Sequence, residues 1–306
     1  MGAEVVVRMG VTLDARQTAI LAGQMQPKFL ATVSRTGEPN VVPVLSLVPY
    51  EPGVAAFAEF MLWKSKANLK ETGRAAFLAL DAKLNYVAAH GTFGGFVTSG
   101  PVFDAMADQP MFRYNPYNGI RGAGTIEIEA VDADGRIPTL ALAAAHLRAA
   151  RLAQSFATGR PAPTMPRQVA EKFARLKALK AIAWPVTTGV AGGGLTSGSG
   201  RVTSGSDGAP SGPGRVGAAG YHVRVLPAAG VAPVGRSALV VADRTAASAV
   251  PDGSRVAVAV ITLEPVAYQV KGTARRGRGA LVIEVSEAYT AGPPVPGQLC
   301  PPAAAE

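Results

Sequence analysis

The sequence has few of the residues that usually form disulfide bonds or hold metals. Among its 306 residues there are one cysteine, Cys300, and three histidines, His90, His146 and His222. A single cysteine excludes an intramolecular disulfide and a cysteine-rich metal cluster. The histidines are too dispersed along the chain for a metal-ligand spacing, and a structural role is expected for each. The sequence therefore predicts no metal site.

Aromatic residues and long apolar runs are also scarce. Aromatics make up 6% of the chain and all hydrophobic residues 48%, so the core must consist mainly of alanine, valine and leucine. No uncharged apolar run approaches the roughly 18 residues that suggest a membrane-spanning helix. The first residues contain no apolar signal core. We therefore expect a cytoplasmic protein without a membrane partner.

Acidic residues are fewer than basic ones. Thirty lysines and arginines against 21 acidic residues give a formal charge of +9, which permits an anionic ligand. The basic residues are scattered, and the densest group, at 275–278, is typical of a hairpin turn. Without a basic block or interleaved aromatics, we expect no nucleic-acid partner. The sequence also contains neither a phosphate-binding P-loop nor a G-x-S-x-G motif.

Short strand-like segments dominate both ends of the chain. Thr12 is expected to cap a helix that ends near residue 22, and strands follow from residue 28 onward. Residues 94–122 are expected to be irregular, with the Gly-rich GTFGGF run forming a turn. Residues 139–180 have a helical pattern, and 189–220 are rich in glycine and serine, which predicts a flexible loop. Five or more short strands in the first part predict an antiparallel barrel.

The order of these segments repeats. An offset of 180 residues places Ala58 over Ala238 and Gly73 over Gly253 without a gap, and AHGTF lies over VKGTA one residue later. Most of the identities are alanine or glycine, so chance similarity between strand-rich segments is the alternative. The shared order, spacing and helical linker favour a true repeat.

The segment FMLWKSKANLKETG brings together Lys64, Ser65, Lys66 and Asn68 where a strand-like run gives way to a helix. A solvated helix start explains the two lysines. A phosphate-binding turn explains the lysines, the hydroxyl and the amide together.

Three segments in this order resemble the pyridoxamine 5′-phosphate oxidase-like family of FMN-binding split barrels. They are FLATVSRTGEPNVVPV, the segment around FMLWKSKANLKETG, and NYVAAHGTF. The resemblance implies a six-stranded antiparallel barrel, usually paired so that FMN lies between two barrels. Here the same chain would supply both barrels.

The resemblance also implies where the cofactor binds. Lys64, Ser65, Lys66 and Asn68 would hold the FMN phosphate, and the flavin ring would lie along Pro43, Val44, Leu45 and Ser46. Core packing is the alternative for Val44 and Leu45. A deazaflavin coenzyme and haem are alternative cofactors, and relatives that handle haem suggest His90 as an axial ligand. The tail lacks the Arg and His residues with which true pyridoxamine phosphate oxidases bind substrate.

We therefore predict a mainly β protein with two tandem split barrels. Its parts are a barrel at 1–138, a helical linker at 139–181, a second barrel at 182–291 with a loop at 189–220, and a Pro-rich tail at 292–306. The expected function is FMN-dependent oxidoreduction of a small molecule. The alternatives are a non-enzymatic flavin- or haem-binding protein and a barrel pair with a decayed site. The two barrels would form an intramolecular pseudo-dimer, as a monomer or a homodimer, and no catalytic residue is assigned.

Overall fold

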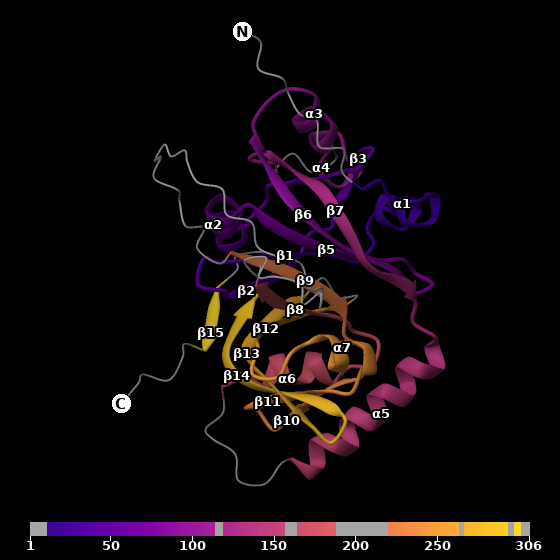
Figure 1. Cartoon of the computed structure of the whole chain (residues 1–306), viewed down its shortest axis with the longest axis vertical. Helices are drawn as coiled ribbons and strands as arrows, with labels where there is room; N and C mark the ends of the chain where they lie inside the picture. The colour runs from indigo at the N-terminus through magenta and orange to yellow at the C-terminus, as the bar shows by residue number, and fades with distance from the viewer. Residues whose placement is uncertain are drawn as a thin grey trace, which may run out of the picture.

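A computed structural model describes residues 11–113, 119–156, 164–187, 220–262, 266–292 and 297–300. Within them the chain is mainly β, with one antiparallel sheet of seven strands and another of eight (Figure 1). The predicted mainly β class and the two split barrels are confirmed, although each sheet has more than six strands. The Gly/Ser-rich segment predicted as a loop lies outside the described residues, apart from Gly220.

The first sheet has the strand order β2-β1-β5-β6-β7-β4-β3. Its strands are β1 (Lys28–Val33), β2 (Pro39–Pro43), β3 (Val48–Glu51), β4 (Val54–Ala58), β5 (Arg74–Leu80), β6 (Asn85–Val97) and β7 (Ala123–Arg136). Its helices are α1 (Ala15–Ala22), α2 (Trp63–Thr72), α3 (Pro101–Ala107) and α4 (Pro110–Arg113).

The second sheet repeats the first, strand for strand. Its order is β9-β8-β12-β13-β14-β11-β10, so each strand occupies the place of the strand seven numbers earlier. Its strands are β8 (Leu179–Thr187), β9 (Tyr221–Pro227), β10 (Val231–Val234), β11 (Ala238–Val241), β12 (Arg255–Ile261), β13 (Ala267–Gly277) and β14 (Ala280–Thr290). Helix α7 (Arg244–Ala249) falls between β11 and β12, as α2 falls between β4 and β5. The internal repeat predicted from the sequence is therefore present in the topology.

Matching bulges support the equivalence of the two barrels in detail. The register between neighbouring strands shifts at Gly91 in the first barrel and at Gly272 in the second. A Cβ atom at these two positions would lie 1.9 and 2.0 Å, respectively, from a carbonyl oxygen of the neighbouring strand. Only glycine fits such an approach. The residues just before the two glycines, His90 and Lys271, are therefore structural equivalents.

Further positions of the two barrels can be matched from equivalent hydrogen bonds and strand pairs. The hairpins close with equivalent bonds, from Val44 N to Lys28 O at 2.8 Å and from Ala228 N to Lys180 O at 2.9 Å. Counting back from these bonds, Asn40 on β2 corresponds to Arg224 on β9. On the neighbouring strands, Ala130 opposite His90 corresponds to Glu287 opposite Lys271.

One hydrophobic core joins the two barrels. On β1, Phe29, Ala31 and Val33 belong to a buried cluster that also contains Ile182 and Val258 of the second barrel. Leu30, between them, faces the separate core of the first barrel. Because β1 is buried on both faces, four of the six residues of its sequence KFLATV are apolar, and they do not alternate with polar residues. Strands β2 and β5 also contact the second barrel, through β12 and β9.

The predicted helical segment forms α5 (Thr139–Ser155) and α6 (Arg167–Ala174). Both helices pack on the second barrel, and Figure 1 shows α5 running along its outer edge. Ala149 and Ala153 of α5 are buried with Ala232 and Val234 of β10. Among the described residues, no helix combines the length and the apolar character needed to cross a membrane.

Two local expectations were wrong. The GTFGGF run is part of β6, because Gly95 (φ 115°) lies at a bulge that lets the strand continue. The 94–122 region includes α3 and α4 in addition to irregular chain. The Pro-rich tail, by contrast, was expected to be extended, and its described part contains a short strand, β15 (Gln298–Cys300), which pairs with β14.

Candidate functional site

A pocket of about 320 Å³ lies where the two barrels meet, and we call it the polar pocket because Lys64, Ser65 and Gln269 are among its otherwise mainly apolar lining residues. The first barrel contributes β2 and the start of α2, and the second contributes β13, the end of β14 and the chain around β15. The lining includes Asn40, Pro43, Trp63, Lys64, Ser65, Gln269, Tyr289 and Gly292. In Figure 1, α2 and β15 lie on the same side of the molecule, at this junction.

An apolar pocket of about 500 Å³ adjoins the polar one. Both pockets are lined by Pro43, Phe60, Leu62, Ala291 and Gly292. The rest of the apolar lining includes Val44, Leu45 and Ser46 of the first barrel, with Met111, Phe112 and Ile261. The two pockets thus form one groove with a polar end and an apolar end, which we call the α2 groove.

Six of the eight predicted cofactor residues line this groove. Lys64 and Ser65 lie at the polar end, Pro43 lies in both pockets, and Val44, Leu45 and Ser46 line the apolar end. The Ser46 hydroxyl accepts a hydrogen bond from Ala58 N at 3.0 Å, which fixes the strand edge. Asn40 donates to Ser65 Oγ at 2.9 Å, so the Ser65 proton can be donated into the pocket.

The other two predicted residues, Lys66 and Asn68, line neither pocket. Lys66 forms an ion pair with Glu59 and lies 5.3 Å from the centre of the Phe96 ring. Asn68 is buried and donates to Thr32 Oγ1 at 3.1 Å, which attaches α2 to β1.

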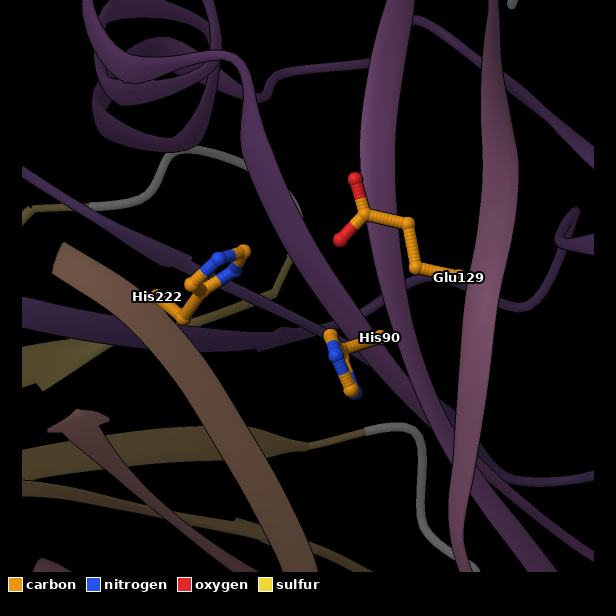
Figure 2. Close-up of side chains that lie close together, drawn as sticks. All are labelled: His90, Glu129 and His222. Atoms are coloured by element: carbon orange, nitrogen blue, oxygen red, sulfur yellow. The ribbon is translucent and has the colours of Figure 1, made fainter. Parts of the chain in front are cut away.

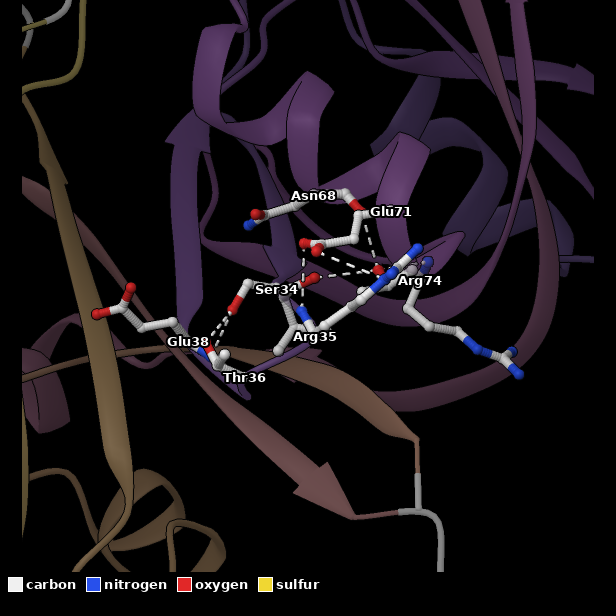
Figure 3. A network of polar contacts seen from close by, with 9 residues as sticks. Ser34, Arg35, Thr36, Glu38, Asn68, Glu71 and Arg74 are labelled. Atoms are coloured by element: carbon white, nitrogen blue, oxygen red, sulfur yellow. Dashed lines mark hydrogen bonds and ion pairs between the residues drawn. The ribbon is translucent and has the colours of Figure 1, made fainter. Parts of the chain in front are cut away.

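A polar network also joins α2 to the β1–β2 turn (Figure 3). Arg35 N donates to Glu71 Oε2 of α2 at 3.3 Å, and the Arg35 guanidinium lies 3.5 Å from the same carboxylate. Within the turn, the Ser34 hydroxyl accepts from Glu38 N at 3.1 Å. This network fixes the position of α2, and with it the side chains at the start of the helix.

Two lysines from different barrels converge at the polar end. Lys64 lines the pocket and pairs with Glu38 at 3.7 Å. Lys271 is buried, and its Nζ has no hydrogen-bond partner among the described residues. Burial, with a smaller contribution from Lys64, lowers the pKa of Lys271 to about 7. A bound anion would favour the charged form of Lys271, so protonation of this lysine and binding of a negatively charged ligand would reinforce each other.

Most other lining residues were not predicted from the sequence, among them three with polar side chains that the second-barrel contact and β2 bring to the pocket. Asn40, Gln269 and Tyr289 all face the polar pocket. Gln269 is buried and donates to Val41 O of the other barrel. Burial and a hydrogen bond to Glu287 raise the pKa of Tyr289 above its usual range. The internal repeat was the one sequence feature that could have indicated residues of the second barrel, because a cofactor bound between two barrels must contact both.

The equivalent groove on the other side of the molecule is partly filled by α5. A pocket of about 440 Å³ remains there, lined by Pro227, Asp243 and Arg244 of the second barrel and by Ala145 and Arg148 of α5, among others. A Cβ atom at Gly230 would lie 2.5 Å from the Ala145 backbone. Helix α5 therefore packs against the chain that corresponds to the apolar end of the α2 groove.

Two of the three dispersed histidines come together in the fold. The rings of His90 on β6 and His222 on β9 lie 5.7 Å apart, centre to centre. Spacing along the sequence missed this pair because each histidine belongs to a different barrel. Burial is the main cause that lowers the pKa of both, so both are neutral near pH 7.

No protein-family model and no curated protein matches the chain. Several solved structures do. HupZ of Group A Streptococcus is 17% identical with a TM-score of 0.34, and the match covers 41% of this chain and 99% of HupZ. An FMN-binding protein of Syntrophomonas wolfei is 19% identical with a TM-score of 0.35, and the match covers 40% of this chain and 85% of that protein.

HutZ, the haem storage protein of Vibrio cholerae, is 13% identical with a TM-score of 0.29, and the match covers 36% of this chain and 87% of HutZ. Each of these proteins is thus matched over most of its own length to less than half of this chain. At these identities the likeness concerns the fold alone. The chain is similar to FMN-binding split-barrel proteins of the pyridoxamine 5′-phosphate oxidase-like class, as its sequence indicated.

Proposed function

We propose that this protein binds FMN in the α2 groove and uses it for redox chemistry on a small molecule. The observation that carries the proposal is the groove itself, lined by both barrels, with two lysines at its polar end and an apolar pocket beside it. FMN has the same division, with a phosphate dianion at one end and a flat, largely apolar ring at the other. Pockets of this size are typical of small-molecule sites.

The residues at each end have distinct roles in this proposal. At the polar end, Lys64 supplies charge to the phosphate and Ser65 a hydroxyl donor. Lys271, whose Nζ lies 5.7 Å from the centre of the Tyr289 ring, adds positive charge when it is protonated. At the apolar end, the chain from Pro43 to Ser46 lies along the ring. The flavin supplies the redox reactivity, and the protein binds and orients it.

Side chains beside the apolar pocket would keep water from the reacting face. Met111 and Phe112, from the α4 region, line it from the first barrel, and Ile261 from the second. No residue of the groove is assigned to proton transfer. A cytoplasmic location is part of the proposal, because reduced nucleotide donors for flavins are abundant there.

The absorption spectrum of freshly purified protein is the first test. Flavin peaks support the proposal, whereas a Soret band or a deazaflavin band would replace FMN with haem or a deazaflavin coenzyme. Titration of FMN-free protein with FMN, followed by fluorescence quenching, then gives the stoichiometry. We expect one tight site per chain, because α5 packs into the second groove. Two equal sites would contradict the asymmetry, and no binding would contradict the cofactor assignment.

A further inference from the structure

A second cluster with ligand chemistry lies on the opposite side of the barrel junction from the α2 groove. The side chains of His90, Glu129 and His222 point toward one another from β6, β7 and β9 (Figure 2). One nitrogen or oxygen atom from each residue lies within 4.8 Å of the other two. We propose that these three residues form a binding site for a divalent transition metal, with Zn²⁺ as the representative ion.

The donor set suits such an ion. Two neutral imidazoles and one carboxylate are the protein ligands of many zinc sites that keep a further position for water. The same set excludes Ca²⁺ and Mg²⁺, which take oxygen ligands almost exclusively. Atoms 4.8 Å apart or less can close around one ion with small side-chain rotations, since ligands at about 2 Å from a metal lie 3–4 Å from each other.

The surroundings of His90 add a second observation. His90 Nδ1 lies 2.8 Å from Asp132 Oδ1, which leaves Nε2 for the metal. A carboxylate on the non-coordinating nitrogen is the usual support of a metal-binding histidine. The Asp132 side chain is only 6% exposed, and its Oδ2 has no hydrogen-bond partner among the described residues.

The remaining ligands are accessible. Glu129 receives hydrogen bonds from Arg74 Nη1, at 3.0 Å, and from the Thr92 hydroxyl, and both are to Oε1. Its Oε2 is therefore available to an ion. Glu129 is exposed and His222 half-buried, so an ion can reach the cluster from solvent.

The cluster lies at the pseudo-symmetric counterpart of the polar end of the α2 groove. His90 of this cluster corresponds to Lys271 beside the α2 groove. Two lysines converge at one junction of the barrels, and two histidines at the other. A metal here would connect the first barrel to the second, independently of any flavin in the α2 groove.

Zinc binding to the untagged chain, stripped with a chelator, tests the proposal by isothermal titration calorimetry. We expect one ion per chain and a higher unfolding temperature with zinc, because the ion binds only the folded state. Glu129→Gln and His222→Gln should each lower the affinity for zinc roughly tenfold or more. Both positions are at least partly exposed, so these variants should fold, which circular dichroism checks.

Matched controls are His146→Gln, which removes the third histidine, and Glu127→Gln, on the same strand as Glu129. Both should bind zinc like the unchanged chain. Co²⁺ in place of zinc should show the strong visible absorption of a four-coordinate site, and Glu129→Gln should alter it. The absence of saturable one-to-one binding would overturn the proposal. Equal affinity in Glu129→Gln, His222→Gln and the unchanged chain would also overturn it.

Discussion

The ammonium groups of Lys64 and Lys271 each lie 5.7 Å from the centre of the Tyr289 ring, although Lys64 belongs to the first barrel and Lys271 to the second. The ring thus marks the point where positive charge from both barrels meets. Lys64 lines the pocket and would contact an anion bound there, whereas Lys271 is buried outside the pocket lining and would act on the anion through its charge. The affinity for a phosphate-bearing ligand should therefore depend on residues from both halves of the chain.

Replacing Lys64 tests where the phosphate binds. Lys64→Ala should weaken FMN by roughly 1.5–3 kcal/mol, the value of a hydrogen bond to a charged group. The affinity for riboflavin, which has no phosphate, should change little. Fluorescence titration with both ligands measures the difference.

Lys66→Ala is the matched control for this experiment. Lys66 is two residues away on the same helix, but it pairs with Glu59 and lines neither pocket. It should leave the preference for FMN over riboflavin unchanged. A selective loss of FMN in Lys66→Ala, and none in Lys64→Ala, would move the phosphate to the other lysine.

Lys271 should make stability depend on pH. Its pKa in the fold is about 7, against 10.5 for an ordinary lysine. Below pH 7 the Lys271 ammonium is charged in both the folded and the unfolded state. The cost of burying this charge near Lys64 then lowers the free energy of unfolding in full. Between the two pKa values the unfolded chain holds a proton that the folded chain has lost, so the free energy of unfolding rises with pH.

Lys271→Met should therefore stabilise the protein most below pH 7, by up to a few kcal/mol. This size follows from the difference between the folded and unfolded pKa values of Lys271, since each pKa unit corresponds to about 1.4 kcal/mol. The gain should shrink as the pH rises. Urea unfolding at several pH values measures it, with the exposed Lys70→Met as a control that should show no such trend. Glu38 and Glu287 raise the pKa of Lys271, whereas Lys64 lowers it. If the stability gain of Lys271→Met did not vary with pH, the two glutamates would be keeping Lys271 charged over the whole pH range.

The two bulge glycines should tolerate no side chain. Gly91→Ala and Gly272→Ala place a Cβ atom against a backbone oxygen, and each should destabilise the fold by roughly 2 kcal/mol or more. Gly119→Ala, with no atom within 4 Å of the added Cβ, should change stability by less than about 0.5 kcal/mol. Thermal unfolding measures all three. A neutral Gly272→Ala would mean that the second barrel lacks the bulge and is not equivalent to the first.

The sequence predicted the barrels well because strands buried on both faces are apolar at successive positions. The sequence predicted the ends of individual helices less well. Thr12 was expected to cap the first helix, but the cap is Asp14, whose carboxylate accepts from Gln17 N at 2.8 Å while the Gln17 side chain accepts from Asp14 N. An acidic residue followed by glutamine three positions later is the stronger capping pattern.

The site was predicted less completely for a geometric reason. Lys64, Ser65, Lys66 and Asn68 were treated as one turn, but they lie on a helix that begins at Trp63. Successive side chains of a helix point about 100° apart, so four of them cannot all face one ligand. The residues of the second barrel that complete the groove, such as Tyr289, depend on how the barrels pack, which the sequence does not show.

The joining of both barrels in one chain has a consequence for how the protein can evolve. In a homodimer each gene encodes both junctions, so every substitution appears in both at once. Here the two junctions are encoded separately, with Lys271 at one and His90 at the corresponding position of the other. Selection can therefore keep a ligand site at one junction while the other is filled by a helix and given different chemistry.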